Sequence, residues 1–309
     1  MLLSSYKKIA FIFPGQGSQS VGMLSGLAIK FPLIKEIYLQ ASEILNYDLW
    51  QLVCFGPEEK LNQTMYTQPA LLVAEIAMWH IFCDHFAIAP MFLAGHSLGE
   101  YTALVCAQTL NFIDALKLVA ERGRLMQQSV DIGVGGMAAI VGLNNEQIIE
   151  LCSQAAQGQI LAPANYNSIG QTVISGELPA IERAVTMAKN LGAKLAKLLP
   201  ISVPSHCELM KPAAEKLAKY LNAVNIKNPN IAVIANADVA AYKNSADIRS
   251  GLVKQLYNPV RWVETIEFLF SSGVDCLVEC GPGKILAGLN KRIINHLPTL
   301  NGEQLLLEK

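Results

Sequence analysis

Short apolar runs, separated by longer segments of helical periodicity, dominate the hydrophobic pattern of the chain. Continuous apolar runs at 8–13 and 91–94 predict strands buried on both faces, because strands with one solvated face alternate apolar and polar residues. Similar runs predict strands at 231–236 and 274–279. Helical patterns occupy 29–83, 101–110, 111–128, a stretch from about 212, 248–257 and a final helix opening at 281–284 and running to about 294. This alternation predicts an α/β fold with a parallel sheet.

The order of elements changes in the middle of the chain. Strands are expected at 137–143, 160–165, 171–176 and 193–201, and helices at 145–157 and 178–191. This β-α-β-β-α-β order is the ferredoxin-like split pattern. We therefore expect a small ferredoxin-like domain at 131–199, inserted into a catalytic core made of residues 1–130 and 200–309.

Composition narrows the class of protein. Of the 309 residues, 52% are hydrophobic and only 16% charged, which favours a globular protein over a disordered one. A formal net charge of -1 gives no reason to expect nucleic acid or an anionic membrane as partner. The seven cysteines contain no C-x-x-C and the five histidines no H-E-x-x-H, so we expect a reduced, cytoplasmic protein without a metal site. No uncharged apolar stretch reaches membrane-spanning length.

The segment 95–99, G-H-S-L-G, lies between a predicted strand and a predicted helix. A serine between two glycines on such a turn presents its hydroxyl at a helix N-terminus, where backbone N–H groups and the helix dipole favour a developing anion. Ser97 is therefore a candidate nucleophile, and the core is expected to be α/β-hydrolase-like. The alternative is a glycine-serine turn without chemistry.

The helix expected at 111–128 carries an arginine among its apolar residues. At 100° per residue, Arg122 falls on the face that carries Leu118 and Val119. A buried guanidinium keeps its charge and needs an anionic partner. Two partners stay open at this point: a carboxylate elsewhere in the chain, or a negatively charged ligand.

A serine hydroxyl needs a base, and histidine is the usual base at neutral pH. His80 and His85 precede the second strand and are interpreted as ordinary, partly buried residues. His96 is next to the serine, but adjacent residues on a tight turn point apart. His206, on a loop after the insert, is the best of several candidates.

A glycine-rich turn, G-Q-G-S-Q at 15–19, follows the first strand. It lacks the G-K-[ST] of a phosphate loop, and Ser20 replaces the third glycine of a dinucleotide-binding turn. The alternative is that this turn lets a backbone N–H approach a ligand closely.

Seven motifs in order resemble those of the bacterial, free-standing malonyl-CoA:acyl carrier protein transacylases, over nearly the whole chain. They are F-P-G-Q-G-S-Q at 13–19, G-H-S-L-G-E at 95–100, R-G at 122–123, N-Y-N-S with G-Q at 165–171, V-P-S-H at 203–206, Q-L-Y-N-P-V at 255–260 and G-P-G-K at 281–284. The chain departs from the family at Ile169, where relatives often have proline, and at Cys280, where a small aliphatic residue is commoner. Neither departure touches the expected chemistry.

The resemblance implies a role for each candidate residue. Ser97 would be acylated, His206 would be its base, and Arg122 would hold the carboxylate of the acyl group. A guanidinium suits that task because it binds a carboxylate with two parallel hydrogen bonds. The resemblance also implies that the backbone carbonyl of Gln255, and not an aspartate, orients the histidine.

The resemblance further implies that backbone N–H groups of Gln16 and Leu98 form an oxyanion hole. Leu98 is also what malonyl-selective members resemble, since methylmalonyl-selective members tend to have glutamine there. Asn165 and Asn167 match cleft positions, so the small domain would close one wall of the site. For both asparagines, capping of the local backbone in a turn is the alternative.

The implied reaction is an exchange through a malonyl-serine intermediate, from malonyl-CoA to the phosphopantetheine thiol of an acyl carrier protein, for fatty acid or polyketide synthesis. No metal or redox cofactor is needed, and we expect a monomer. Carrier proteins of this family's systems are acidic, so a basic rim is expected; ordinary solvated residues are the alternative. Its candidates are Lys189, Lys194, Lys197, Lys284, Lys291 and Arg292. A serine hydrolase or thioester-editing enzyme, and a non-catalytic scaffold that docks a carrier protein, are the competing functions.

Overall fold

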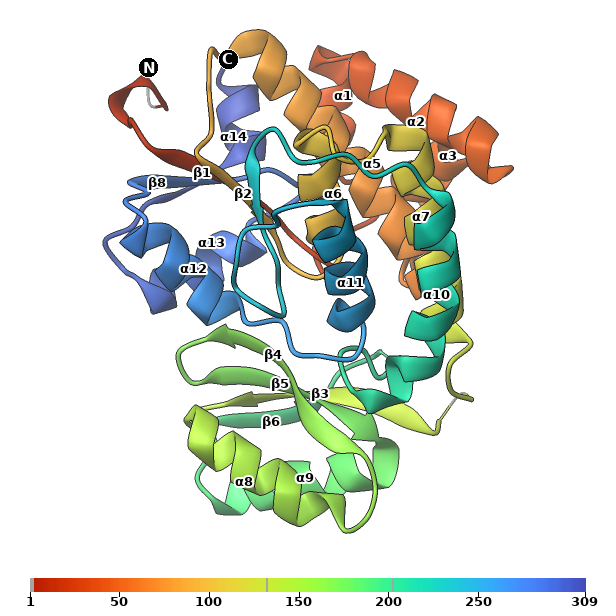
Figure 1. Ribbon diagram of the computed structural model, residues 1–309, viewed down its shortest axis with the longest axis vertical. Helices are drawn as coiled ribbons and strands as arrows, with labels where there is room; N and C mark the ends of the chain where they lie inside the picture. The colour runs from red at the N-terminus through yellow and green to blue at the C-terminus, as the bar shows by residue number, and fades with distance from the viewer. Residues whose placement is uncertain (1–2, 132, 202) are drawn as a thin grey trace.

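A computed structural model describes residues 3–131, 133–201 and 203–309 as two sheets, one parallel and one antiparallel, with helices around them (Figure 1). The parallel sheet has the strand order β7-β2-β1-β8-β9. Its strands are β1 (Ile9–Phe13), β2 (Phe92–Gly95), β7 (Ala232–Ile234), β8 (Cys276–Glu279) and β9 (Thr299–Asn301). It contains all four strands predicted for the core, and the predicted α/β fold is confirmed.

Both faces of the parallel sheet are buried. On β1, Phe11 and Phe13 belong to one apolar cluster, whereas Ala10 and Ile12 belong to another. The second cluster is completed by α12 (Trp262–Ser271) and α13 (Ile285–Ile293). The first is completed by α1 (Ser25–Lys30), α2 (Leu33–Leu45), α3 (Leu49–Phe55), α4 (Glu58–Leu61), α5 (Thr64–His85), α6 (Gly99–Cys106), α7 (Phe112–Gln127), α10 (Lys211–Ala223), α11 (Ser245–Gln255), α14 (Gly302–Leu307) and 3-10 helices at Leu3–Ser5 and Glu208–Met210. This two-sided burial explains why β1 is apolar at every position.

The antiparallel sheet, in the lower part of Figure 1, has the strand order β4-β5-β3-β6. Its elements follow the predicted β-α-β-β-α-β order: β3 (Gly135–Val141), α8 (Asn145–Ala156), β4 (Leu161–Ser168), β5 (Gln171–Glu177), α9 (Leu178–Asn190) and β6 (Leu195–Leu198). Helices α8 and α9 pack on one face. The domain limits at 131–199 stay a prediction.

Strand β4 ties the small sheet to the rest of the molecule. The backbone N–H of Tyr166 donates to the carbonyl of Val260 at 3.0 Å, and the N–H of Val260 donates to the carbonyl of Ala164 at 2.9 Å. Nη1 of Arg292 donates to Oε1 of Gln171 at 2.6 Å. The two backbone bonds hold the small sheet against the segment that follows α11, and the Arg292 bond holds it against α13.

Three predictions about elements need correction. The helix expected to be the last, α13, ends at Ile293 and is followed by β9 and α14. Strand β9 has three residues and pairs with β8, a contact distant in sequence that local periodicity does not reveal. Helix α12 forms at 262–271, where no element is predicted. The strand expected at 193–201 is shorter, as β6. Ser202, for which a loop is predicted, lies outside the described residues.

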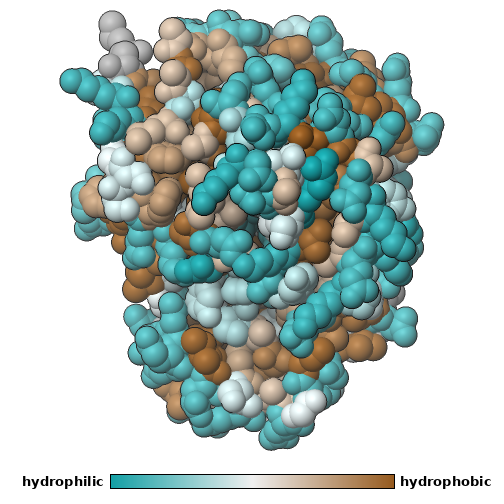
Figure 2. All heavy atoms as spheres, viewed as in Figure 1, coloured by the Kyte–Doolittle hydropathy of each residue, from teal (hydrophilic) through white to brown (hydrophobic). Residues whose placement is uncertain are grey.

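Hydrophilic and hydrophobic residues are interspersed over the face of the molecule seen in Figure 2. No helix in the described ranges is long and apolar enough to span a membrane. Within the same ranges, no group of three His, Cys, Asp or Glu side chains is arranged to hold a metal ion. The seven cysteines are all free thiols.

Candidate active site

The turn between β2 and α6 carries Ser97 at the carboxyl end of the parallel sheet. Ser97 has a backbone φ of 53°, a sparsely populated region for a residue with a side chain, as in a nucleophile elbow. The flanking glycines are required by close packing. A Cβ on Gly95 would lie 1.8 Å from the carbonyl carbon of Gly99, and a Cβ on Gly99 would lie 2.2 Å from the carbonyl oxygen of Phe13.

His206 reaches the serine from the loop after the small sheet. Its Nε2 lies 2.8 Å from Ser97 Oγ, and its Nδ1 lies 2.8 Å from the backbone oxygen of Gln255. Because a carbonyl oxygen only accepts, Nδ1 carries the proton and Nε2 is free to take the serine proton. Gln255 ends α11, where backbone carbonyls lack partners within the helix. The structure therefore brings these three residues into the arrangement expected from the resemblance.

Burial and the positive charge of Arg122 lower the pKa of His206 to about 3. The hydrogen bond from Nδ1 to Gln255 acts in the opposite direction but does not outweigh burial. His206 is therefore neutral at physiological pH and able to act as a base.

Arg122 projects from α7 toward the same point and is only 1% exposed. Its Nη2 donates to Ser97 Oγ at 3.2 Å and to Oε1 of Gln255 at 2.9 Å. Among the described residues Arg122 forms no ion pair, and its Nε has no hydrogen-bond partner. Burial lowers the pKa of Arg122, yet a guanidinium stays protonated in proteins. Arg122 thus has no carboxylate partner within the described chain. Of the two partners left open by the sequence, the negatively charged ligand remains.

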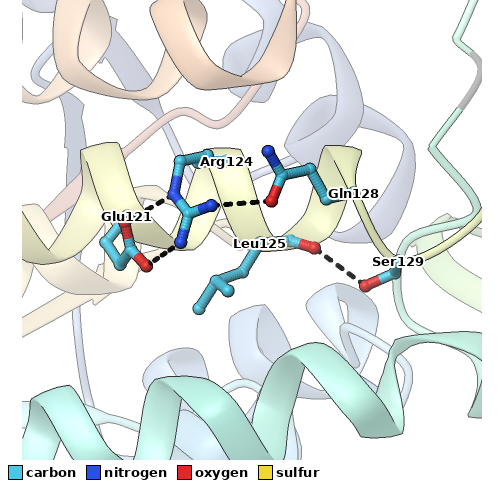
Figure 3. A network of polar contacts seen from close by, with 5 residues as sticks. All are labelled: Glu121, Arg124, Leu125, Gln128 and Ser129. Carbon is cyan, nitrogen blue, oxygen red and sulfur yellow. Dashed lines mark hydrogen bonds and ion pairs between the residues drawn. The ribbon is translucent and has the colours of Figure 1, made fainter.

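Arg124, two positions further along α7, has the partner that Arg122 lacks (Figure 3). Its Nε and Nη2 donate to the two carboxylate oxygens of Glu121 at 2.8 and 2.5 Å, and its Nη1 donates to Gln128 at 2.6 Å. Helix α7 therefore carries two different arginines. Arg124 forms an ion pair on the polar stripe, whereas Arg122 faces Ser97 and forms no ion pair with the described residues.

A cavity of about 270 Å³ lies between the two sheets in front of Ser97. Apolar side chains from the small sheet and the loop after it, including Met137, Val173 and Leu199, line part of its wall. The predicted site residues that line it are Gln16, Ser97, Leu98, Arg122, Asn165, Asn167 and His206. Gln255 lies behind this wall, in contact with three of its members.

The two predicted oxyanion donors flank the cavity from neighbouring turns. Leu98 is the N-cap of α6, and Gln16 follows β1. Within the described part of the chain, neither backbone N–H donates a hydrogen bond, so both are available to a ligand. The side chain of Gln16 is anchored separately, by a 3.3 Å hydrogen bond from Nε2 to Thr64 Oγ1.

His96 contacts the small sheet instead of serving as the base. Its Nε2 donates to Oδ1 of Asn167 on β4 at 2.8 Å. The Asn167 side chain therefore reaches across the cavity to His96. This contact replaces the alternative in which the side chain caps the backbone of its own turn. Asn165 lines the cavity as expected. The pairing of His96 with Asn167 has no signal in sequence spacing, because it depends on how the two sheets meet.

Two further residues, not predicted from the sequence, lie behind and beside the nucleophile. Asn236, two residues beyond β7, accepts from the N–H of Ser97 at 2.7 Å and donates from Nδ2 to the carbonyl of Gly95 at 2.6 Å. Its only sequence signal is its place after a strand that pairs with β2. Gln68 lines the cavity with an Oε1 atom that is buried and unpartnered in the described ranges.

Fold and cavity place the chain in the class of enzymes that act on acyl groups. The sequence profile of the acyl transferase domain matches residues 10–295, and the chain belongs to this family. A malonyl CoA-acyl carrier protein transacylase from Haemophilus influenzae is 53% identical over 296 residues, which are 96% of this chain and 95% of the relative. The family resemblance found in the motifs is confirmed.

Two solved structures are similar over nearly their whole length. The malonyl CoA-acyl carrier protein transacylase from Coxiella burnetii has a TM-score of 0.96 at 49% identity, with 98% of this chain and 96% of that chain covered. A malonyl-transacylase in complex with its type II polyketide synthase acyl-carrier protein has a TM-score of 0.95 at 50% identity, with 98% and 99% covered.

Proposed function

We propose that this protein transfers the malonyl group of malonyl-CoA to the phosphopantetheine thiol of an acyl carrier protein, with Ser97 as the acylated residue. The observation that carries the proposal is Arg122, a buried guanidinium that forms no ion pair with the described residues and whose Nη2 lies 3.2 Å from the serine hydroxyl. Malonyl has a carboxylate one methylene away from the reacting carbonyl. A cation at this distance therefore fits malonyl and has no partner in a plain fatty-acyl group.

In the first half-reaction, Ser97 Oγ attacks the thioester carbonyl while its proton passes to His206 Nε2. The carbonyl oxygen becomes an oxyanion that the N–H groups of Gln16 and Leu98 stabilise, a contribution of about 2.7–4 kcal/mol for one such donor. Collapse of this intermediate breaks the carbon–sulfur bond. CoA leaves as a thiol with the proton from His206, and malonyl stays on Ser97 as an ester.

The second half-reaction reverses these roles. The phosphopantetheine thiol gives its proton to His206 and attacks the malonyl-serine ester. Ser97 leaves and recovers the proton, and the malonyl thioester remains on the carrier. Every group in this cycle belongs to the chain or to its two substrates. The proposed reaction therefore needs no cofactor, and we propose a single chain as the working unit. We place the reaction in the cytoplasm, which suits seven free cysteines, and in fatty acid or polyketide synthesis.

The proposed carrier surface comprises basic residues that are all exposed and form no ion pair within the described ranges. Lys189 lies on α9, and Lys194 and Lys197 lie at β6. Lys284, Lys291 and Arg292 lie at α13. Because the first group lies on elements packed with the antiparallel sheet and the second on a helix packed against the parallel sheet, a carrier that contacted both would bridge the two halves of the molecule.

Malonyl-CoA supplied with and without a phosphopantetheine-loaded carrier protein separates a transferase from a thioester hydrolase. We expect slow release of free malonate without the carrier and rapid appearance of malonyl-carrier when it is present, because the carrier thiol is the proposed acceptor. Chromatographic measurement of both products tests this. Malonate released at the same rate in both reactions would contradict the proposal and favour a hydrolase.

The pH dependence of acylation should lack the usual loss of histidine-dependent activity near pH 6.5. His206 works in its neutral form, and a pKa lowered to about 3 keeps that form populated as the pH falls from about 7.5 to about 5.5. We expect kcat/KM for malonyl-CoA to change by less than about twofold over this interval. A fall of about tenfold, fitting one proton with a pKa near 6.5, would show that burial does not keep His206 neutral.

A further inference from the structure

Glu100 is a buried carboxylate behind the nucleophile turn that the proposed reaction does not use. It lies in the first turn of α6 and has no exposed surface. Its Oε2 accepts from Nε2 of Gln255 at 2.7 Å and from the backbone N–H of Asn236 at 3.2 Å. Its Oε1 accepts a short hydrogen bond from the hydroxyl of Tyr242. A buried carboxylate with three donors has a defined position, because each lost donor leaves an unsatisfied polar group.

The Gln255 side chain connects this carboxylate with the arginine in the cavity. Its Nε2 donates to Glu100 and also to the carbonyl of Ser97 at 2.8 Å, while its Oε1 accepts from Nη2 of Arg122 at 2.9 Å. A flipped amide would direct its NH₂ group at the guanidinium and its oxygen at two acceptors. The two acceptors, the Ser97 carbonyl and the Glu100 carboxylate, therefore fix the Gln255 amide so that its oxygen faces Arg122.

We propose that Glu100 is a positioning residue for malonyl recognition: through the Gln255 amide it holds the Arg122 guanidinium in place to receive the carboxylate of the acyl group. The inference rests on the proposed function, since it assigns Arg122 to that carboxylate. Gln255 then has two tasks. Its backbone carbonyl orients His206, and its side chain orients Arg122.

The electrostatics of the cluster agree with this geometry. Arg122 has no ion pair among the described residues, and Glu100 is the buried carboxylate on the other side of the amide that contacts it. Burial raises the pKa of Glu100 to about 7, and hydrogen bonds from Tyr242 and Gln255 oppose that increase. The position of the guanidinium is thus set by hydrogen bonds through an amide, and both its Nε and its charge remain available to a substrate carboxylate.

Substitutions at position 100 separate hydrogen bonding from charge. In Glu100→Gln, the amide oxygen can occupy the Oε2 position and still accept from Gln255 and Asn236, while its NH₂ group faces the Tyr242 oxygen. Glu100→Leu removes both acceptor atoms and frees the Gln255 amide on that side. Tyr242→Phe removes one donor to Glu100 without touching Gln255, and serves as the matched control.

The test measures single-turnover acylation by malonyl-CoA and by acetyl-CoA, followed by intact mass spectrometry. Acylation of the wild-type protein by malonyl-CoA tests the malonyl-serine step of the proposed function independently. We expect Glu100→Leu to lower the malonyl-to-acetyl rate ratio by about tenfold or more, because a misplaced guanidinium affects only the acyl group with a carboxylate. Glu100→Gln and Tyr242→Phe should keep the ratio within about twofold of wild type.

Three results would overturn the inference in a wild-type protein that malonyl-CoA acylates. They are unchanged rates with both acyl groups in Glu100→Leu, equal losses of both rates in that variant, so that the ratio again stays at the wild-type value, and a Glu100→Gln variant as impaired as Glu100→Leu. Circular dichroism establishes whether each variant is folded. If Glu100→Leu is not, Glu100→Asp replaces it, since it keeps the charge but withdraws the carboxylate from Gln255 by one methylene, and the same fall in ratio is expected.

Discussion

Ser97→Ala is expected to abolish the malonyl adduct and to lower malonyl transfer by about a millionfold, the scale of loss when a serine nucleophile is removed. The variant retains the cavity, Arg122 and the backbone N–H groups, so malonyl-CoA should still bind. It lacks the one oxygen that lies 2.8 Å from His206 Nε2. Intact mass spectrometry after incubation with malonyl-CoA measures the adduct directly.

Ser205→Ala is the matched control for this experiment. Ser205 also lines the cavity and precedes the histidine, yet it is not on the strained turn. We expect its adduct to form as in wild type. His206→Ala should also form an adduct, but slowly, because the hydroxyl remains and only its base is missing. Continued labelling of the Ser97→Ala protein would point to a different nucleophile.

Arg122→Ala is expected to lower malonyl transfer by about 10²–10⁴-fold while it affects acetyl transfer much less. Two hydrogen bonds from a guanidinium to a carboxylate contribute about 1.5–3 kcal/mol each, and about 1.4 kcal/mol corresponds to a factor of ten. Acetyl has no carboxylate and does not lose these bonds. The measurement compares kcat/KM for malonyl-CoA and acetyl-CoA in the variant and wild type.

Arg124→Ala controls for the removal of an arginine from the same helix. Arg124 binds Glu121 and Gln128 along the polar stripe of α7 and does not line the cavity (Figure 3). Its loss should leave the selectivity unchanged, since Arg124 does not line the cavity in which the acyl group would bind. If Arg122→Ala has the same malonyl-to-acetyl preference as wild type, Arg122 does not bind the carboxylate.

Much of the fold is predictable from local pattern. The apolar runs at β1 and β2 indicate a sheet covered on both faces, and this is how the strands lie. The order of elements between β3 and β6 is predictable because each has its own periodicity. Strand β9 is not predictable, because three residues are too few to show a hydrophobic period and the strand depends on pairing with β8.

The candidate site is predictable where the chemistry depends on residue type. Ser97 is predictable because it lies between two glycines on a strand-to-helix turn. Arg122 is predictable because it is a charged residue on an apolar helix face. Sequence alone leaves two partners open for Arg122, and only the burial and contacts of the folded chain favour a ligand over an internal carboxylate. Gln255 is predictable only as a backbone carbonyl, through a family resemblance.

The supporting residues are not predictable, because they come together through the packing of distant elements. Asn236 follows β7, Tyr242 lies beyond it, and both meet Glu100 behind the nucleophile turn. Glu100 belongs to the motif at 95–100, but the sequence does not reveal its partners, because Asn236 and Tyr242 have no spacing that distinguishes them from surface residues. The same is true of His96 and Asn167, whose contact depends on the junction between the two sheets.

The central claim is that malonyl resides on Ser97 and moves from there to a carrier thiol. The most direct test is to isolate the acylated protein, free of malonyl-CoA, and mix it with phosphopantetheine-loaded carrier protein. The account predicts that the protein loses the mass of one malonyl group while the carrier gains it. Loss of malonyl from the protein as free malonate, with the carrier unmodified, would contradict the account.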